Sequence, residues 1–391
     1  MRNLQHEKPT IRREDALPAT DTYKNDDIEL LRAIAVGFIL LHHSPDLFVW
    51  NGMWRNIFAI TSFWGGVDLF FCISGFVIAS SLLRETRSGS FIGFAIPFWI
   101  KRIWRIWPAA LLWALIGILA SKFFNRSGVF GDFHSNLMDG IAATMQVANL
   151  HFMECWNYDR GVCGKLGIYW SLSLEEQFYT LFPFALFFVP RRWLCLGLLV
   201  SVVFQFFLPR PIAGVLWLIR TDAICYGVLI ALAQQTVFKD KLFPAFLQGK
   251  PAAIAFSLTF VLLMAMTANF TAASFNVGML AAVCAALVFV ASYDRNLILP
   301  IRSLNPVLAW MGSRSFAIYL THLFSYWLTR EIFYRLYSGA AFDASFILPF
   351  GTVALGFIVL FSELTYRFIE TPFRVRGRDI AKRYSPSIEL S

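Results

Sequence analysis

The sequence predicts an all-α polytopic membrane protein, with about ten transmembrane helices in one bundle and both termini in the cytoplasm. The composition is the first reason. Of the 391 residues, 57% are hydrophobic and only 15% are charged, whereas a soluble domain carries charge on about a quarter of its residues. The other two reasons are the recurrence of long apolar segments and the distribution of Lys and Arg. These observations exclude an ordinary soluble enzyme.

Ten segments have the apolar length that a helix needs to cross roughly 30 Å of hydrocarbon. We expect them at 28–46, 63–83, 106–124, 169–189, 193–208, 214–235, 252–270, 274–292, 307–329 and 345–368. The segment 137–152 is short and half polar, so we expect an interfacial or re-entrant helix there. The domains are then a disordered cytoplasmic tail at 1–27, a membrane domain at 28–370 and a cytoplasmic tail at 371–391.

The positive charge indicates an orientation. The net charge is +9, and most Lys and Arg residues lie in segments that a cytoplasmic N-terminus would place inside. Cytoplasmic loops of membrane proteins carry this excess. We therefore expect a multi-pass membrane protein, in contact with the lipid bilayer and with no nucleic-acid partner. No internal repeat is evident, although many transporters are built from inverted repeats.

The first apolar segment carries an arginine near its start and a histidine pair near its end. Arg32 and His43 are eleven residues apart, which is close to a whole number of helical turns, so both project from one face. His42 points about 100° away from that face. Ionisable side chains inside a membrane helix are costly, and they mark functional sites by default. We place His43 in the outer half of the membrane, about 16 Å from Arg32 along the helix.

Carboxylates at the starts of two other spans are expected in the same outer half. Asp68 is a lone carboxylate in a glycine-containing apolar run, where it either orients a neighbouring residue in a packing motif or takes part in chemistry. Glu175 and Glu176 point about 100° apart, so they do not face one partner. One of them is a solvated helix end, and the other is a candidate to orient a histidine ring.

Two arginines lie among tryptophans before the third span. Arg102 and Arg105 are spaced i,i+3 and share a helix face. Arginines in an aromatic belt are typical of an interfacial helix with snorkelling side chains. The same pair also fits an anion site, because a guanidinium binds phosphate through two parallel hydrogen bonds. Both interpretations remain open. Arg314 lies at the same predicted inner boundary.

Further polar residues have both a structural and a functional interpretation. Arg220 and Asp222 either neutralise each other or neighbouring groups, and His322 is either a hydrogen-bonded core histidine or a site residue. Cys155 and Cys163 share a loop that the predicted topology places outside, where they form a disulfide or remain free thiols. No metal site is expected.

Taken together, these residues resemble the integral-membrane acyltransferase-3 family over about residues 25–370. The resemblance rests on the following residues and motifs: the spacing of Arg32 and His43, the run Gly65-Gly66-Val67-Asp68-Leu69-Phe70-Phe71, the pair Arg102-x-x-Arg105, the run Trp170-Ser171-Leu172-Ser173-Leu174-Glu175-Glu176-Gln177-Phe178, and Tyr319-Leu320-x-His322. The order of these pieces along the chain makes the resemblance specific. One departure is His42, where relatives often carry an aromatic residue.

The resemblance implies a bacterial O-acyltransferase that moves an acyl group, most commonly acetyl, from cytoplasmic acyl-CoA to a hydroxyl of a surface or secreted glycan. His43 corresponds to the histidine on which the family depends, and we expect it to act as general base. Asp68 or Glu176 would stabilise its imidazolium.

The remaining site residues fall into two groups. The donor phosphates would contact four arginines, Arg32, Arg102, Arg105 and Arg314. The glycan or lipid-linked saccharide acceptor would contact Glu175, Arg220, Asp222 and His322. We expect no permanently bound cofactor, because acyl-CoA is the donor substrate. The alternative is a transporter or flippase of a lipid-linked sugar in which His43 and the carboxylates relay protons.

Overall fold

The computed structural model describes residues 25–49, 52–85, 90–158, 162–270, 273–301, 303–337 and 341–384. Within these ranges the protein is helical and contains no strand, as predicted. The expected tail at 1–27 falls mostly outside them, and Asp26 and Asp27 already belong to the first helix. The last residues, 385–391, also lie outside the described part of the chain.

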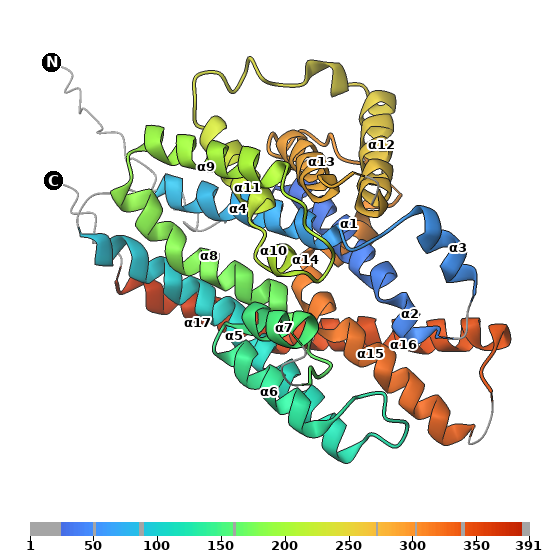
Figure 1. The fold of residues 1–391 in the computed structure, drawn as a ribbon. Coiled ribbons are helices and arrows are strands. Elements are labelled where there is room, and N and C mark those ends of the chain that lie inside the picture. The colour runs from blue at the N-terminus through green and yellow to red at the C-terminus, as the bar shows by residue number, and fades with distance from the viewer. Residues whose placement is uncertain are drawn as a thin grey trace, which may run out of the picture.

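The helices follow one another along the chain, and the connection from α11 to α12 is a long one (Figure 1). In chain order they are α1 Asp26–His42, α2 Ser44–Leu47, α3 Met53–Ile60, α4 Gly66–Arg84, α5 Phe91–Phe123, α6 Phe133–Thr144, α7 Ala148–Asn157, α8 Tyr169–Phe188, α9 Arg191–Phe206, α10 Val215–Leu218, α11 Asp222–Ala233, η1 Ala245–Leu247, α12 Lys250–Asn269, α13 Asn276–Ala291, α14 Asn305–Ser313, α15 Ser315–Leu336, η2 Ala344–Phe346, α16 Ile347–Thr365, the π-helical turn η3 Tyr366–Glu370 and α17 Thr371–Lys382.

Six helical segments of the described chain are long and apolar enough to cross a membrane. They are Asp26–Leu47, Gly66–Arg84, Phe91–Phe123, Val215–Ala233, Lys250–Asn269 and Ala344–Lys382. The chain is therefore a multi-pass membrane protein. The count of ten spans and the cytoplasmic placement of the termini stay predictions.

Several predicted spans differ from the helices of the structure. The tryptophan-rich segment and the third span form one helix, α5, of 33 residues, instead of an interfacial helix followed by a span. The sixth span is broken between α10 and α11 at Arg220, and the ninth is broken between α14 and α15 at Arg314. The short segment expected at 137–152 is two helices, α6 and α7. At each break the helix is interrupted although the hydropathy pattern of the sequence is continuous.

The range expected as a C-terminal tail contains a further helix. α17 continues the chain directly after α16 and η3 and lies alongside α5 (Figure 1). Phe373 of α17 stacks on Trp104 of α5 at 5.7 Å between ring centroids. Gly377 faces the same tryptophan, and a Cβ at this position would overlap the Trp104 side chain. The folded unit therefore extends past residue 370.

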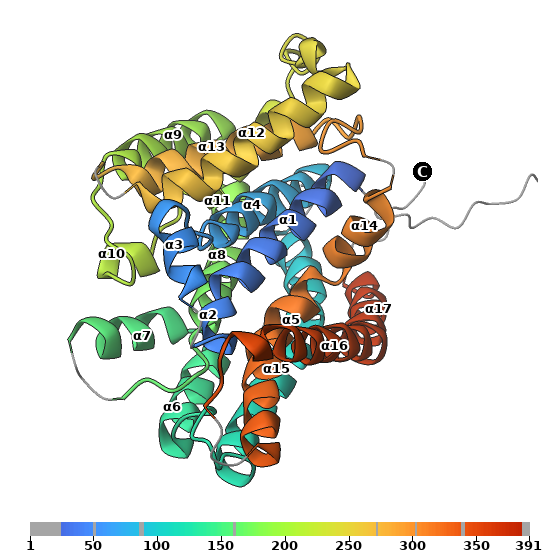
Figure 2. The same ribbon diagram turned by 90° about the vertical axis from the view of Figure 1, so that its right-hand side faces the viewer.

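Helices α1, α4 and α11 form the centre of the bundle (Figure 2). Gly75 of α4 and Gly227 of α11 let the two backbones touch, since a Cβ on Gly75 would meet the carbonyl oxygen of Ile224 and one on Gly227 that of Cys72. Small residues allow such close approach between membrane helices. The glycines of the second span therefore serve helix packing here.

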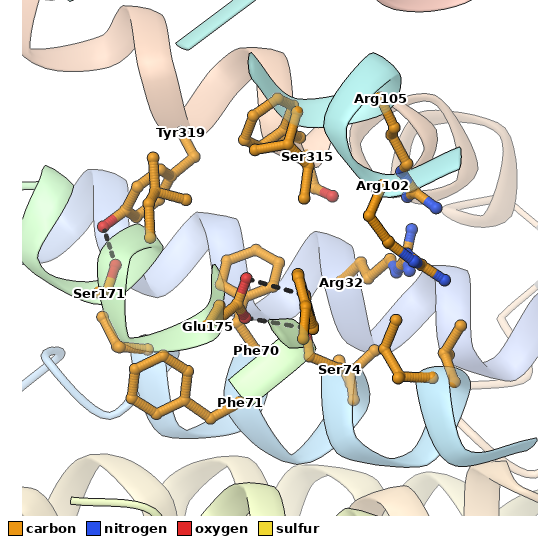
Figure 3. Close-up of a pocket in the computed structure, with 18 residues that line it drawn as sticks. Arg32, Phe70, Phe71, Ser74, Arg102, Arg105, Ser171, Glu175, Ser315 and Tyr319 are labelled. Carbon is orange, nitrogen blue, oxygen red and sulfur yellow. Dashed lines mark hydrogen bonds between the residues drawn. The ribbon is translucent and has the colours of Figure 1, made fainter. Parts of the chain in front are cut away.

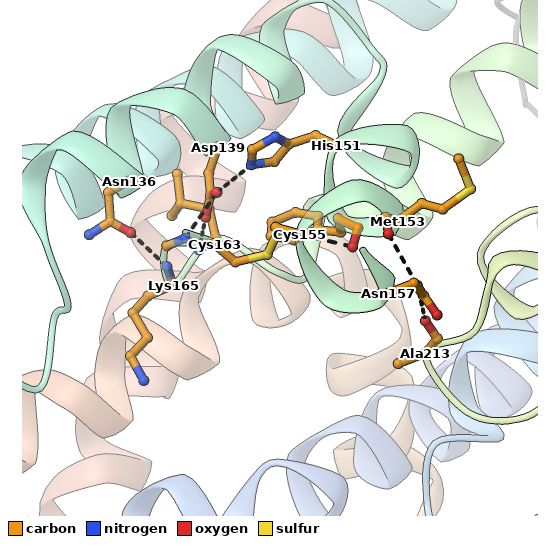
Figure 4. The surroundings of a disulfide bond; sticks show 12 residues. Asn136, Asp139, His151, Met153, Cys155, Asn157, Cys163, Lys165 and Ala213 are labelled. Atoms are coloured by element: carbon orange, nitrogen blue, oxygen red, sulfur yellow. Dashed lines mark hydrogen bonds and ion pairs between the residues drawn. A yellow bond between two sulfur atoms is a disulfide. The ribbon is translucent and has the colours of Figure 1, made fainter. Parts of the chain in front are cut away.

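A disulfide joins Cys155 in α7 to Cys163 in the loop that leads to α8 (Figure 4). Beside it, Asp139 is fully buried and accepts hydrogen bonds from the backbone N–H groups of Gly164 and Leu166, both at 3.1 Å. Its carboxylate also lies 2.9 Å from Nε2 of His151. Of the two states left open for the cysteines, the structure has the disulfide, and this linked loop fixes the start of α8.

Candidate active site

A cavity lies between α1, α4, α5, α8 and α15, and its volume is about 770 Å³ when the open space at its entrance is included. Its polar lining residues come from all five helices, and Figure 3 shows how they face one another. They are Arg32, Ser74, Arg102, Arg105, Ser171, Glu175, Tyr179, Ser315 and Tyr319. The rest of the lining is aliphatic or aromatic. A pocket that is mainly apolar with a few polar groups is the usual form of a small-molecule site.

Three arginines give the cavity a cationic side. The nitrogen ends of Arg32, Arg102 and Arg105 gather in one region, while Glu175 and Tyr319 lie across from them (Figure 3). Arg32 lies 3.5 Å from Glu29. Neither Arg102 nor Arg105 has a carboxylate within 4.0 Å in the described residues, so their charges are not neutralised by an ion pair. Three neighbouring guanidinium groups favour a multiply charged anion such as a phosphate ester.

One carboxylate lies in the same cavity. Glu175 accepts hydrogen bonds from Ser74 Oγ at 2.8 Å and from the Tyr179 hydroxyl at 3.1 Å. Sequence depth placed Glu175 in an outer layer, apart from the inner arginines. The structure instead brings the two groups into one cavity, where α5, which carries Arg102 and Arg105, packs against α8. Arg102 also lies 5.6 Å from the Tyr179 ring centroid.

A cluster of histidines lies beyond Tyr319. The His43 ring centroid is 5.2 Å from that of His322, which is in turn 5.9 Å from the Tyr319 ring that lines the cavity. His42 packs edge-on against His43 at 4.8 Å. The His43 side chain is 25% exposed, whereas His322 is fully buried, so of these two rings only His43 is open to a substrate.

Asp46 is a candidate site residue that sequence reasoning missed. Its carboxylate lies 3.5 Å from Nδ1 of His43, one helical turn back along the chain. This contact leaves Nε2 of His43 for a reacting hydroxyl, the arrangement that a general base needs. The sequence did contain a signal, the i,i+3 spacing of His43 and Asp46 around Pro45.

The tautomer of His322 follows from its backbone contact. Nδ1 lies 2.7 Å from the Tyr319 carbonyl oxygen, and since a carbonyl only accepts hydrogen bonds, Nδ1 carries the proton. Nε2 is then a bare acceptor, and it has no hydrogen-bond partner in the described residues although it is buried. An unpaired buried acceptor is unusual in a protein core, and its place beside His43 makes His322 a candidate site residue.

Asp68 lies in a different cluster. Both of its oxygens accept hydrogen bonds from Arg220 at 2.8 Å, and the pair is fully buried. The Arg220 guanidinium packs on the indoles of Trp217 at 4.0 Å and Trp170 at 4.9 Å. The structure thus pairs Asp68 with Arg220 and not with His43. Asp222 does not pair with Arg220 either, because it binds Arg210 at 2.6 Å.

Two other predicted site residues lie outside the cavity lining. Glu176 points away from Glu175, as the helical spacing required, and accepts a hydrogen bond from Trp107 Nε1 at 3.3 Å. Arg314 pairs with Glu363 at 2.8 Å and packs over the Tyr366 ring. The cavity therefore brings together Arg32, Arg102, Arg105 and Glu175, and the histidine cluster contains His43 and His322. Asp68, Glu176, Arg220, Asp222 and Arg314 lie in other contacts.

Comparison with known proteins decides the family. A family model described as an acyltransferase domain matches residues 25–363. The chain belongs to the acyltransferase-3 family. This confirms the resemblance, and with it an acyltransferase enzyme, which fits a membrane bundle with a cationic cavity and a histidine next to a carboxylate. No solved structure matches the chain significantly.

Curated relatives of the acyltransferase-3 family are similar over most of this chain. Peptidoglycan O-acetyltransferase OatA of Listeria monocytogenes is 29% identical over 90% of the chain and 56% of its own length. A putative O-acetyltransferase of Staphylococcus aureus is 28% identical over 89% of the chain and 57% of its own length. A putative peptidoglycan O-acetyltransferase, YrhL of Bacillus subtilis, is 27% identical over 90% of the chain and 55% of its own length. The chain thus spans little more than half of these relatives.

Proposed function

We propose that this protein is an O-acetyltransferase of the bacterial inner membrane, which moves an acetyl group from cytoplasmic acetyl-CoA to a hydroxyl of a cell-surface glycan. Peptidoglycan is the first acceptor to test, because two of the three relatives described above carry that glycan in their names. The acyltransferase-3 family supplies the reaction class. The donor and the catalytic group are argued from the geometry of the site.

The observation that carries the donor is the cationic side of the cavity. Arg102 and Arg105 have no ion-pair partner in the described residues, and Arg32 adds a third guanidinium to the same lining. The diphosphate of acyl-CoA would satisfy these groups through charge-assisted hydrogen bonds. The apolar lining of α4 suits the uncharged pantetheine arm. This arm would lead the thioester past Tyr319 toward the histidines.

His43 is the proposed general base. The acceptor hydroxyl oxygen attacks the thioester carbonyl carbon while its proton passes to Nε2 of His43. The carbon–sulfur bond then breaks, and the leaving CoA thiolate takes the proton from the imidazolium, so His43 returns to its starting state. Asp46 stabilises the imidazolium from the Nδ1 side. General-base assistance of this kind contributes about 10²–10⁴-fold.

The test uses purified full-length protein in lipid nanodiscs with acetyl-CoA labelled in the acetyl group and soluble peptidoglycan fragments. We expect label in the glycan as an alkali-labile ester, and no label with the His43→Ala variant. Label in a different glycan would support the proposed reaction and replace only the proposed acceptor. Movement of unmodified lipid-linked sugar across liposomes without acetyl transfer would contradict the proposal and favour a transporter.

A further inference from the structure

Helix α17 is held firmly against the arginine-bearing part of α5. The stacking of Phe373 on Trp104 and the close approach at Gly377 fix its position along α5. It follows a π-helical turn, η3, and such turns are frequent at functional sites. Figure 2 shows α17 on the side of the bundle where α1 begins. The part of α17 around Phe373 therefore lies against the part of α5 that carries Arg105.

Arg374 lies in this part of α17, as does Arg376, whose guanidinium lies 5.5 Å from the Trp104 ring centroid. Arg374 is next to Phe373 in the chain, and its guanidinium lies 5.8 Å from the Tyr366 ring centroid. Phe373 stacks on Trp104, the residue before Arg105, and Arg105 lines the cavity, so the positive charge continues from the cavity to α17. A row of cations thus extends beyond the residues that enclose the cavity.

The charge of Arg374 remains available to a ligand. Within the described residues no carboxylate lies within 4.0 Å of Arg374, whereas Arg314, on the same tyrosine ring, is paired with Glu363. Glu370 is the buried carboxylate nearby, and its Oε1 has no hydrogen-bond partner in the described residues.

We propose that Arg374 binds the 3′-phosphate on the ribose of the acyl-CoA donor. This inference rests on the proposed function and adds the residue that recognises the nucleotide end. Acyl-CoA carries a diphosphate next to the pantetheine arm and a separate phosphate on the ribose beyond it. The site has a matching order: the histidine cluster, Tyr319, the cavity arginines, and then Arg374. If the thioester lies near His43 and the diphosphate at Arg102 and Arg105, the ribose phosphate falls toward α17.

The experiment compares the binding of CoA and 3′-dephospho-CoA to the full-length protein in nanodiscs by calorimetry. The wild type should bind CoA more tightly than 3′-dephospho-CoA. Arg374→Gln should weaken CoA binding by about tenfold or more, the size expected for a hydrogen bond to a charged group, and should leave 3′-dephospho-CoA binding unchanged. Arg374→Lys should restore part of the preference, because it keeps a point charge without the planar fork.

The matched control is Lys382→Gln, which removes one charge from the same helix at an exposed residue paired with Asp379. It should bind both ligands like the wild type. Equal affinity of the wild type for the two ligands, or an equal loss for both in Arg374→Gln, would overturn the inference and leave the proposed function standing. Failure of the wild type to bind either ligand would instead contradict the proposed donor. If Arg374→Gln does not fold, the wild-type ratio and Arg374→Lys still decide.

Discussion

The carboxylate of Asp46 lies 3.5 Å from Nδ1 of His43, across the point where α1 ends and α2 begins. The two residues are brought together by a helix break, because α1 ends at His42 and the chain turns again at Ser44. A carboxylate on one ring nitrogen fixes the tautomer and stabilises the protonated ring. The pair therefore fits the proposed roles of a general base and of the carboxylate that stabilises its protonated ring.

We expect Asp46→Asn to lower kcat by about 10²-fold and to leave the KM for acetyl-CoA near its wild-type value. The reason is that the amide keeps the shape but does not stabilise the imidazolium, whereas general-base help is worth about 10²–10⁴-fold. Steady-state kinetics with labelled acetyl-CoA would measure both constants. A rise in KM with unchanged kcat would place Asp46 in donor binding instead.

The two adjacent histidines should respond differently to substitution. His43→Ala should abolish acetyl transfer, while His42→Ala should keep much of it, because His43 contacts both Asp46 and His322, whereas His42 forms no ion pair in the described residues. The same glycan-labelling assay measures both variants. The reverse result would show that the shared helix face of Arg32 and His43 is not the criterion that identifies the catalytic histidine.

The cavity arginines should control donor affinity. Arg102→Gln combined with Arg105→Gln should raise the Kd for acetyl-CoA by about 10²-fold, since two charge-assisted contacts are lost. Lys101→Gln is the matched control, because Lys101 is adjacent on α5 but pairs with Glu85 at 3.1 Å. Calorimetry on the purified variants gives the Kd. A similar loss for Lys101→Gln would mean that general surface charge, and not the cavity, attracts the donor.

Asp68 should behave as a stability residue. Asp68→Asn leaves Arg220 buried without its charge partner, and breaking a buried pair costs about 3–5 kcal/mol. We expect a lower midpoint of thermal unfolding in detergent, with a reduced yield of folded protein. The double variant Asp68→Leu with Arg220→Met should recover part of the stability, because no buried charge remains. A stable but inactive Asp68→Asn protein would indicate that Asp68 takes part in catalysis instead.

The disulfide can be tested with a free cysteine as control. Cys155→Ser should destabilise the protein by about 2–4 kcal/mol, the usual contribution of a disulfide, whereas Cys195→Ser should have little effect because Cys195 is unpaired. Thermal unfolding measures both. Peptide mapping without reductant should also recover Cys155 and Cys163 in one linked fragment. Two separate thiol-bearing peptides would show that the bond does not form in the cell.

Much of the fold could be predicted because the hydropathy of a chain segment directly indicates whether that segment lies in lipid. The helical class and the apolar segments follow from composition and from the length of the hydrophobic runs. The breaks at Arg220 and Arg314 could not be predicted in the same way. Each arginine lies with a few polar neighbours in a span that is apolar overall, so the average over the span conceals it, and its partner, Asp68 or Glu363, is distant in sequence.

The sequence named candidate residues for the site but not their contacts. Arg102 and Arg105 could be named as candidates for an anion site, beside the interfacial interpretation, but their place in one cavity with Glu175 could not be predicted, because the sequence does not reveal that α5 continues through them. Asp46 was missed because the apolar pattern predicts one unbroken helix from residue 28 to residue 46. Spacing identifies residues on one helix face, whereas the contacts between α1, α5, α8 and α15 depend on tertiary packing.

The three guanidinium groups in one cavity also affect the protein before any reaction occurs. Their mutual repulsion is present in the free protein and is relieved when an anion binds, so donor binding and resistance to unfolding are thermodynamically linked. A ligand at about 100 times its Kd adds roughly 2.7 kcal/mol to the free energy of unfolding. If acetyl-CoA is the donor, as proposed, its scarcity should raise the unfolded fraction, and membrane proteases should remove more of the enzyme. The amount of active protein would then follow the metabolic supply of its own donor.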